Sequence, residues 1–237
     1  MQRYQWILEP GTGAYTIEPG DVNKGRSITQ TRLTDWWAKD KKFVRYRFNP
    51  DKRVFSVMRD VNKMQQAFLR GDYDMLRIRL PETWYDKLDP SQVEPLGKGW
   101  VHRAQFFNEI PRPTYALYMN QTKAPLDNVD VRIGLHHATN WQMIVDEYFR
   151  GDYQRMRTSS DGYGRFTHPT LQPRGFSVEE AEAAFGRAGY TERGPDGIFR
   201  NAAGERLSFT LTTGYKRLEN VLTILEREAR KAGVEYK

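Results

Sequence analysis

The sequence predicts an α/β fold with a mixed sheet, and three observations support this prediction. Its 237 residues are enough for one large domain or two small ones. Hydrophobic residues make up 38% of the chain and charged residues 28%, which is close to the composition of globular proteins. Strand–helix–strand patterns occur near both ends of the chain, and no repeat of fixed period is visible.

The first third of the chain contains predicted strands followed by a helix. Apolar clusters and alternation bounded by turn residues predict strands at Ala14–Ile17, Ser27–Leu33 and Arg53–Met58. Apolar residues at three- and four-residue spacing predict a helix over Val61–Arg70. Asp60 is a suitable N-cap for this helix, and Gly71 is suited to the left-handed residue that ends it.

The middle of the chain alternates between extended segments and helices. Extended segments are expected at Tyr73–Ile78, Val101–Phe107 and Tyr115–Asn120. Helical turns are expected over Glu82–Leu88, Val129–Ala138 and Trp141–Phe149. Asn140 can cap the last of these helices.

Residues 151–176 are rich in Gly, Ser, Thr, Pro and Arg and have no apolar period. We therefore predict a long irregular surface segment. Such a length is unusual in a compact domain unless the loop is functional or is packed by its own side chains.

The last quarter begins with a capping box, Ser177 to Glu180, which predicts a helix that ends at Gly189. Turn residues at 195–197 and 201–204 then predict a hairpin. The remaining predicted elements are a strand at Leu207–Thr212, a helix at Tyr215–Ala232 and a strand at Val234–Lys237.

The composition excludes several classes of protein. The chain has no cysteine, so disulfides, thiol nucleophiles and thiolate metal sites are all excluded. No apolar stretch approaches the ~20 residues of a membrane-spanning helix, and the first residues do not resemble a secretion signal. These observations do not fix the compartment.

The net charge of +7 is compatible with an acidic partner. The run Lys39–Phe48 interleaves cations with Phe43, Tyr46 and Phe48, as a platform for single-stranded nucleic acid would. The same run describes an exposed loop that leads into a strand, with its Lys and Arg stems lying over apolar neighbours. We favour the loop and keep a nucleic-acid-binding module as the alternative function.

No catalytic or metal-binding constellation is visible. The four histidines include no pair at the i, i+4 spacing of a helical zinc site, and the chain has no Gly-x-Ser-x-Gly or Ser-x-x-Lys motif. We therefore expect neither an enzyme nor a cofactor. The 6 Trp and 13 Tyr, by contrast, are residues that binding surfaces use to hold ligands of varied shape, although many of them must belong to the core.

The order of short motifs along nearly the whole chain resembles one family. The motifs are Gly11–Ile17, Gly25–Thr29, Asp35–Trp37, Arg59–Asp74, Tyr118–Asn120, Pro125–Arg132, Ala188–Tyr190 and Ala232–Val234. In this order they resemble the family 5 extracellular solute-binding proteins of bacterial ABC importers, the dipeptide and oligopeptide binders, and especially their YejA-like branch.

The resemblance implies a type II periplasmic-binding-protein-like fold, in which two lobes close on a peptide and deliver it to a membrane permease without chemistry. Residues 1–237 then correspond to the distal lobe alone, so the fold is incomplete. A periplasmic location is expected for the parent protein, and no nucleic-acid partner. The isolated chain is also expected to self-associate through surfaces that the rest of the protein covers.

The resemblance also supplies candidate ligand-binding residues. In the oligopeptide-binding relatives, the cleft is faced by the strand that ends at the position of Asn120 and by the first turn of the helix after Leu207–Thr212. The candidates are Tyr115, Tyr118, Asn120, Tyr215 and Lys216. The identities at several of these positions differ from those of the best-known relatives, which leaves the preferred charge of the ligand open.

Overall fold

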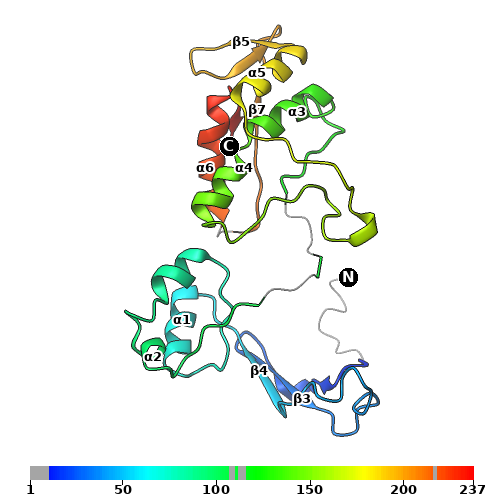
Figure 1. Ribbon diagram of the computed structural model, residues 1–237, viewed down its shortest axis with the longest axis vertical. Helices are drawn as coiled ribbons and strands as arrows, with labels where there is room; N and C mark the ends of the chain where they lie inside the picture. The colour runs from blue at the N-terminus through cyan, green and yellow to red at the C-terminus, as the bar shows by residue number, and fades with distance from the viewer. Residues whose placement is uncertain (1–10, 107–109, 112–115, 216–217) are drawn as a thin grey trace. The chain divides into compact units, whose positions relative to one another are not determined.

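The computed structural model describes residues 11–106, 110–111, 116–215 and 218–237 (Figure 1). The chain forms two compact units, Met1–Arg77 (unit 1) and Ile78–Lys237 (unit 2). Each unit combines helices with strands, so the predicted α/β class is confirmed.

Unit 1 is built on a small antiparallel sheet. Its strands are β1 (Tyr15–Thr16), β2 (Val22–Asn23), β3 (Ser27–Arg32) and β4 (Lys52–Ser56), with a short 3₁₀ turn, η2 (Pro19–Asp21), before β2. Strand β3 pairs with the other three, and Ile28 lies opposite Phe55. The three predicted strands are therefore confirmed. The basic run leads into β4 as a series of turns, as the loop interpretation expected.

The helix of unit 1, α1 (Val61–Leu69), has the predicted ends. The Asp60 carboxylate accepts a hydrogen bond from the Lys63 backbone N–H at 2.8 Å, and Gly71 has a φ of 87°. The strand predicted at Tyr73–Ile78 is wrong. Those residues pair with no strand in the described part of the chain, and an isolated extended segment has no ladder to join.

Helices dominate unit 2. They are η3 (Glu82–Lys87), α2 (Glu94–Gly97), α3 (Val129–Ala138), α4 (Trp141–Met143), η4 (Ile144–Tyr148), η5 (Gly164–Phe166), α5 (Val178–Arg187) and α6 (Glu219–Lys231). The predicted caps Asn140 and Ser177 accept backbone hydrogen bonds, and so does Asn128, the N-cap of α3. Helix α6 begins at Glu219 rather than at the predicted Tyr215.

The strands of unit 2 form two pairs. Strands β5 (Tyr190–Arg193) and β6 (Phe199–Asn201) make the predicted antiparallel hairpin, whereas β7 (Ser208–Phe209) and β8 (Glu235–Tyr236) are parallel. The pairing is therefore mixed in direction. Residues 101–106 and 116–120 form no strand, and Phe107 and Tyr115 lie outside the described residues.

Unit 2 contains two apolar clusters. The larger one lies where α3 packs against α5 and α6, and Phe185 is fully buried in it (Figure 1). The smaller one joins Ile144 of η4 to Val221 and Leu225 of α6. Buried polar contacts tie the same elements together: Glu228 accepts a hydrogen bond from Asn140 at 3.2 Å, and the hydroxyls of Thr139 and Tyr236 lie 2.8 Å apart. These clusters fix the helices against which the segments with the candidate residues pack.

Candidate ligand-binding face

Residues 116–120 alternate between the core and the surface. Leu117 packs against the smaller apolar cluster and Met119 against the larger one. Tyr118 and Asn120 alternate with them and point outward, and 81% of Tyr118 is exposed. The alternation is that of an extended chain with one face on a core, so the segment is held by its apolar side while it presents its polar side to solvent.

Tyr215 lies just before α6 and is 53% exposed. Leu218, three residues further on, packs against the same small cluster as Leu117. Leu117 and Leu218, which lie close in sequence to Tyr118 and Tyr215, therefore pack against the same apolar cluster.

The other three candidates are either bonded locally or outside the described residues. Asn120 uses its side-chain oxygen locally, where it accepts hydrogen bonds from the backbone N–H of Thr122 at 3.1 Å and from its hydroxyl at 2.7 Å. Tyr115 and Lys216 lie outside the described residues. Tyr118, Asn120 and Tyr215 thus remain the candidates that the structure describes.

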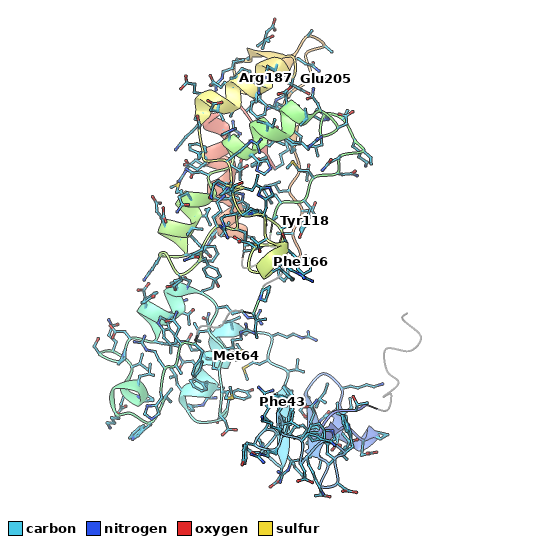
Figure 2. All side chains as sticks on the ribbon, turned by 45° about the vertical axis from the view of Figure 1, so that its right-hand side comes forward. Phe43, Met64, Tyr118, Phe166, Arg187 and Glu205 are labelled. Carbon is cyan, nitrogen blue, oxygen red and sulfur yellow. The ribbon has the colours of Figure 1, made fainter. Side chains whose placement is uncertain are left out.

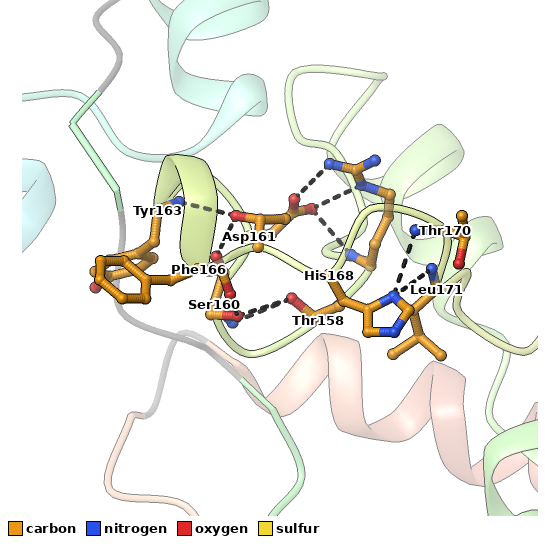
Figure 3. Close-up of polar contacts among 10 residues, drawn as sticks. Thr158, Ser160, Asp161, Tyr163, Phe166, His168, Thr170 and Leu171 are labelled. Carbon is orange, nitrogen blue, oxygen red and sulfur yellow. Dashed lines mark hydrogen bonds and ion pairs between the residues drawn. The ribbon is translucent and has the colours of Figure 1, made fainter.

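The long loop predicted at 151–176 is irregular apart from η5, and it is tied to itself (Figure 3). The Ser160 hydroxyl donates to the Phe166 carbonyl at 2.9 Å, and the Thr167 hydroxyl donates to the Ser160 carbonyl at 2.6 Å. The Thr167 oxygen also accepts from the Tyr163 backbone N–H at 3.1 Å. These bonds close residues 160–167 into a small hydrogen-bonded loop, which we call the knot although the chain is not threaded. The long loop is thus packed by its own side chains.

Charged and imidazole groups strengthen the base of this knot. Arg157 donates to Asp161 at 2.8 Å, and its hydrogen bonds hold the pKa of that carboxyl below its usual range. The Nδ1 of His168 accepts from the backbone N–H groups of Thr170 and Leu171, so its ring proton is on Nε2 in this arrangement (Figure 3).

The adjacent histidines of α3 have separate environments. His137 lies with Nδ1 2.9 Å from the Gly175 carbonyl at the end of the long loop. Burial lowers the pKa of His136, and the nearby guanidinium groups of Arg174 and Arg155 lower it further. The positive charges of these two arginines oppose the binding of a cation at this imidazole.

A shallow cavity of about 450 Å³ lies elsewhere on unit 2. Its lining includes Asp127, Tyr190, Glu205 and Arg206, and burial together with the two carboxylates raises the pKa of Tyr190. Figure 2 shows Glu205 at one end of unit 2 and Tyr118 toward the other. The cavity is therefore separate from the predicted face.

In the part of the chain that the structure describes, no group of three His, Asp or Glu side chains could hold a metal ion. Among the same residues no helix is both long and apolar enough to cross a bilayer.

The comparisons with known proteins identify the family. Residues 9–237 match the model of the bacterial extracellular solute-binding proteins, family 5 Middle. The chain belongs to this family. The resemblance inferred from the motif order is thereby confirmed.

The names of similar proteins mention different ligands. The chain is 21% identical over 228 residues to the nickel-binding periplasmic protein of Escherichia coli K12, which covers 95% of this chain and 40% of the relative. Two solved structures share the fold. One is the oligopeptide-binding protein AppA of Bacillus subtilis with a nonapeptide, at 20% identity and a TM-score of 0.63, covering 95% of this chain and 41% of AppA. The other is a Thermotoga maritima oligopeptide-binding protein with mannohexaose, at 17% identity and a TM-score of 0.69, covering 99% of this chain and 43% of that protein.

The chain therefore spans about 40% of the length of these relatives. Tyr118 and Tyr215, which the resemblance predicts to face the cleft, are exposed, and their contact with a ligand stays a prediction. Sequence reasoning missed the knot at 160–167. Its only sequence signal is the density of Ser, Thr, Asp and Gly in an aperiodic loop, which predicts turns without saying which side chain bonds which carbonyl.

Proposed function

We propose that this chain forms part of the ligand cleft of the substrate-binding component of an ABC-type peptide importer, with residues 1–237 as its distal-lobe portion. The observation that carries the proposal is membership of family 5 together with the outward position of Tyr118 and Tyr215 on segments that pack against one apolar cluster. Rigid amphipathic rings of this kind contact peptide side chains at little entropic cost.

In this proposal the protein works in the periplasm, binds without chemical change and hands the peptide to a membrane permease. Binding is completed when the remainder of the longer protein closes on the ligand. In the isolated chain, the exposed apolar face of β3 and β4 is the surface through which self-association would occur.

The test is calorimetric titration of the full-length protein with a pool of short peptides and, separately, with Ni²⁺ and its histidine complex. Peptide binding is expected, and Tyr118→Ala and Tyr215→Ala should each weaken it by about tenfold, the effect of losing ~1.4 kcal/mol of contact energy. Tyr46→Ala, an exposed tyrosine of unit 1, is the control. Binding of nickel but no peptide, or of single-stranded oligonucleotide with steep salt dependence, would overturn the proposal.

A further inference from the structure

The knot at residues 160–167 has polar side chains inside and aromatic rings outside. The side chains turned toward its interior are half-buried and polar: Ser160, Asp161 and Thr167. The rings of Tyr163 and Phe166 point away and are 46% and 69% exposed. A loop that closed on itself for stability alone would bury its rings, because removing a ring from water stabilises the folded state and leaving it exposed does not.

Hydrogen bonds hold the backbone of the knot on both sides of these rings. Phe166 is fixed through its carbonyl by Ser160, and Tyr163 through its N–H by Thr167. The guanidinium of Arg165 lies 5.0 Å from the centre of the Phe166 ring and supports it from one side. The backbone that carries the rings is thus held in place, and a partner that contacts them has little loop entropy to remove.

The knot also lies beside the segment that leads to the candidate face. The position that a Cβ would take on Gly162 is 3.8 Å from the Cα of Pro111, so the two backbones are in contact there. Pro111 precedes the chain that carries Tyr118. Figure 2 shows Tyr118 and Phe166 on the same side of unit 2.

We infer that Tyr163 and Phe166 form a subsite for one large apolar side chain of the bound peptide. This inference rests on the proposed function and adds a determinant of specificity to it. Aromatic rings on the same side of unit 2 as the candidate residue Tyr118 favour an aromatic or branched aliphatic side chain over alanine. The two rings do not affect the hydrogen bonds to the peptide backbone, because other groups make those bonds.

The experiment uses the full-length protein and a set of pentapeptides in which a single phenylalanine is moved through the five positions of penta-alanine. The wild-type protein is expected to prefer one of these positions. Phe166→Ala should reduce the affinity for that peptide by about tenfold and leave the affinity for penta-alanine unchanged. Phe166→Leu should retain most of the preference, because it keeps an apolar side chain in place.

Val129→Ala is the control, since Val129 is an exposed apolar residue of unit 2 outside the knot. Thermal melting of each variant verifies that the fold is intact. An equal loss for all peptides, no loss in Phe166→Ala, or the same loss in the control overturns the inference while the proposed function stands. A wild-type protein that binds no peptide of the set overturns the proposed function, and the inference with it.

Discussion

The two units bury their apolar side chains to very different extents. In unit 2, Phe185, Ile144 and Leu225 are fully enclosed by helices and strands of the same unit. In the described part of unit 1 the buried side chains are small or polar: Ala14, Ala38, Gln65 and Ala67. Many of its large apolar residues are exposed, including Phe43, Tyr46, Val54, Phe55 and Val57.

The difference shows that a regular secondary-structure pattern does not by itself produce a closed core. Strand β3 pairs with β4 in a regular ladder, yet Phe55 remains 53% exposed although it lies opposite Ile28. A two-layer arrangement needs a second layer over such a face. Because the chain spans about 40% of its relatives' length, we expect that the rest of the longer protein supplies that layer.

The largest effect expected from this comparison is at Phe185. Phe185→Ala should lower the free energy of unfolding of the 237-residue chain by about 3–5 kcal/mol, since it opens a cavity in a closed core. Phe55→Ala should change it by less than about 0.5 kcal/mol, because its ring already faces solvent. Denaturant unfolding followed by circular dichroism measures both, and equal effects would contradict the contrast between the units.

A smaller effect is expected at Gly134, in the middle of α3. A Cβ at this position would overlap the ring of Phe185, so Gly134→Ala should destabilise the chain by about 1–3 kcal/mol despite its better helix propensity. Gly186 in α5 is the matched control, because a Cβ there meets nothing within 4 Å. Gly186→Ala should stabilise by about 0.5–1 kcal/mol, and a stabilising Gly134→Ala would show that α3 and α5 are packed loosely.

The smallest expected effect concerns Tyr236, whose hydroxyl contacts Thr139 inside unit 2. Tyr236→Phe should cost about 1 kcal/mol at neutral pH. Burial raises the pKa of Tyr236 to about 12, above the value of 10.0 in an unfolded chain. The stabilisation by the Tyr236 hydroxyl is therefore complete below pH 10 and is lost as the pH rises toward 12. In that window Tyr236 ionises in the unfolded chain but not in the folded one.

Unfolding titrations of the wild type and Tyr236→Phe between pH 7 and 12 test this. The stability difference between the two proteins should shrink above pH 10. A difference that stays constant to pH 12 would mean that the hydroxyl is not enclosed as the structure shows.

Helix ends were the most predictable part of the fold. Asp60, Asn140 and Ser177 cap as expected because the cap depends on a bond to the residue three positions away. The strand expected at Tyr73–Ile78 failed because a strand needs a partner, which one segment's pattern does not specify. The outward tyrosines could be predicted from the family resemblance, whereas the Ser160 and Thr167 bonds in the long loop follow no period.

The hydrogen bonds of the knot involve the backbone at positions 163 and 166 and not the identity of the rings there. Substitutions at these two positions can therefore alter the shape and polarity of the loop tip while Ser160 and Thr167 preserve its course. Under the proposed subsite, point mutations at these two positions would change which peptide side chain is preferred, and the backbone beneath them would keep its course.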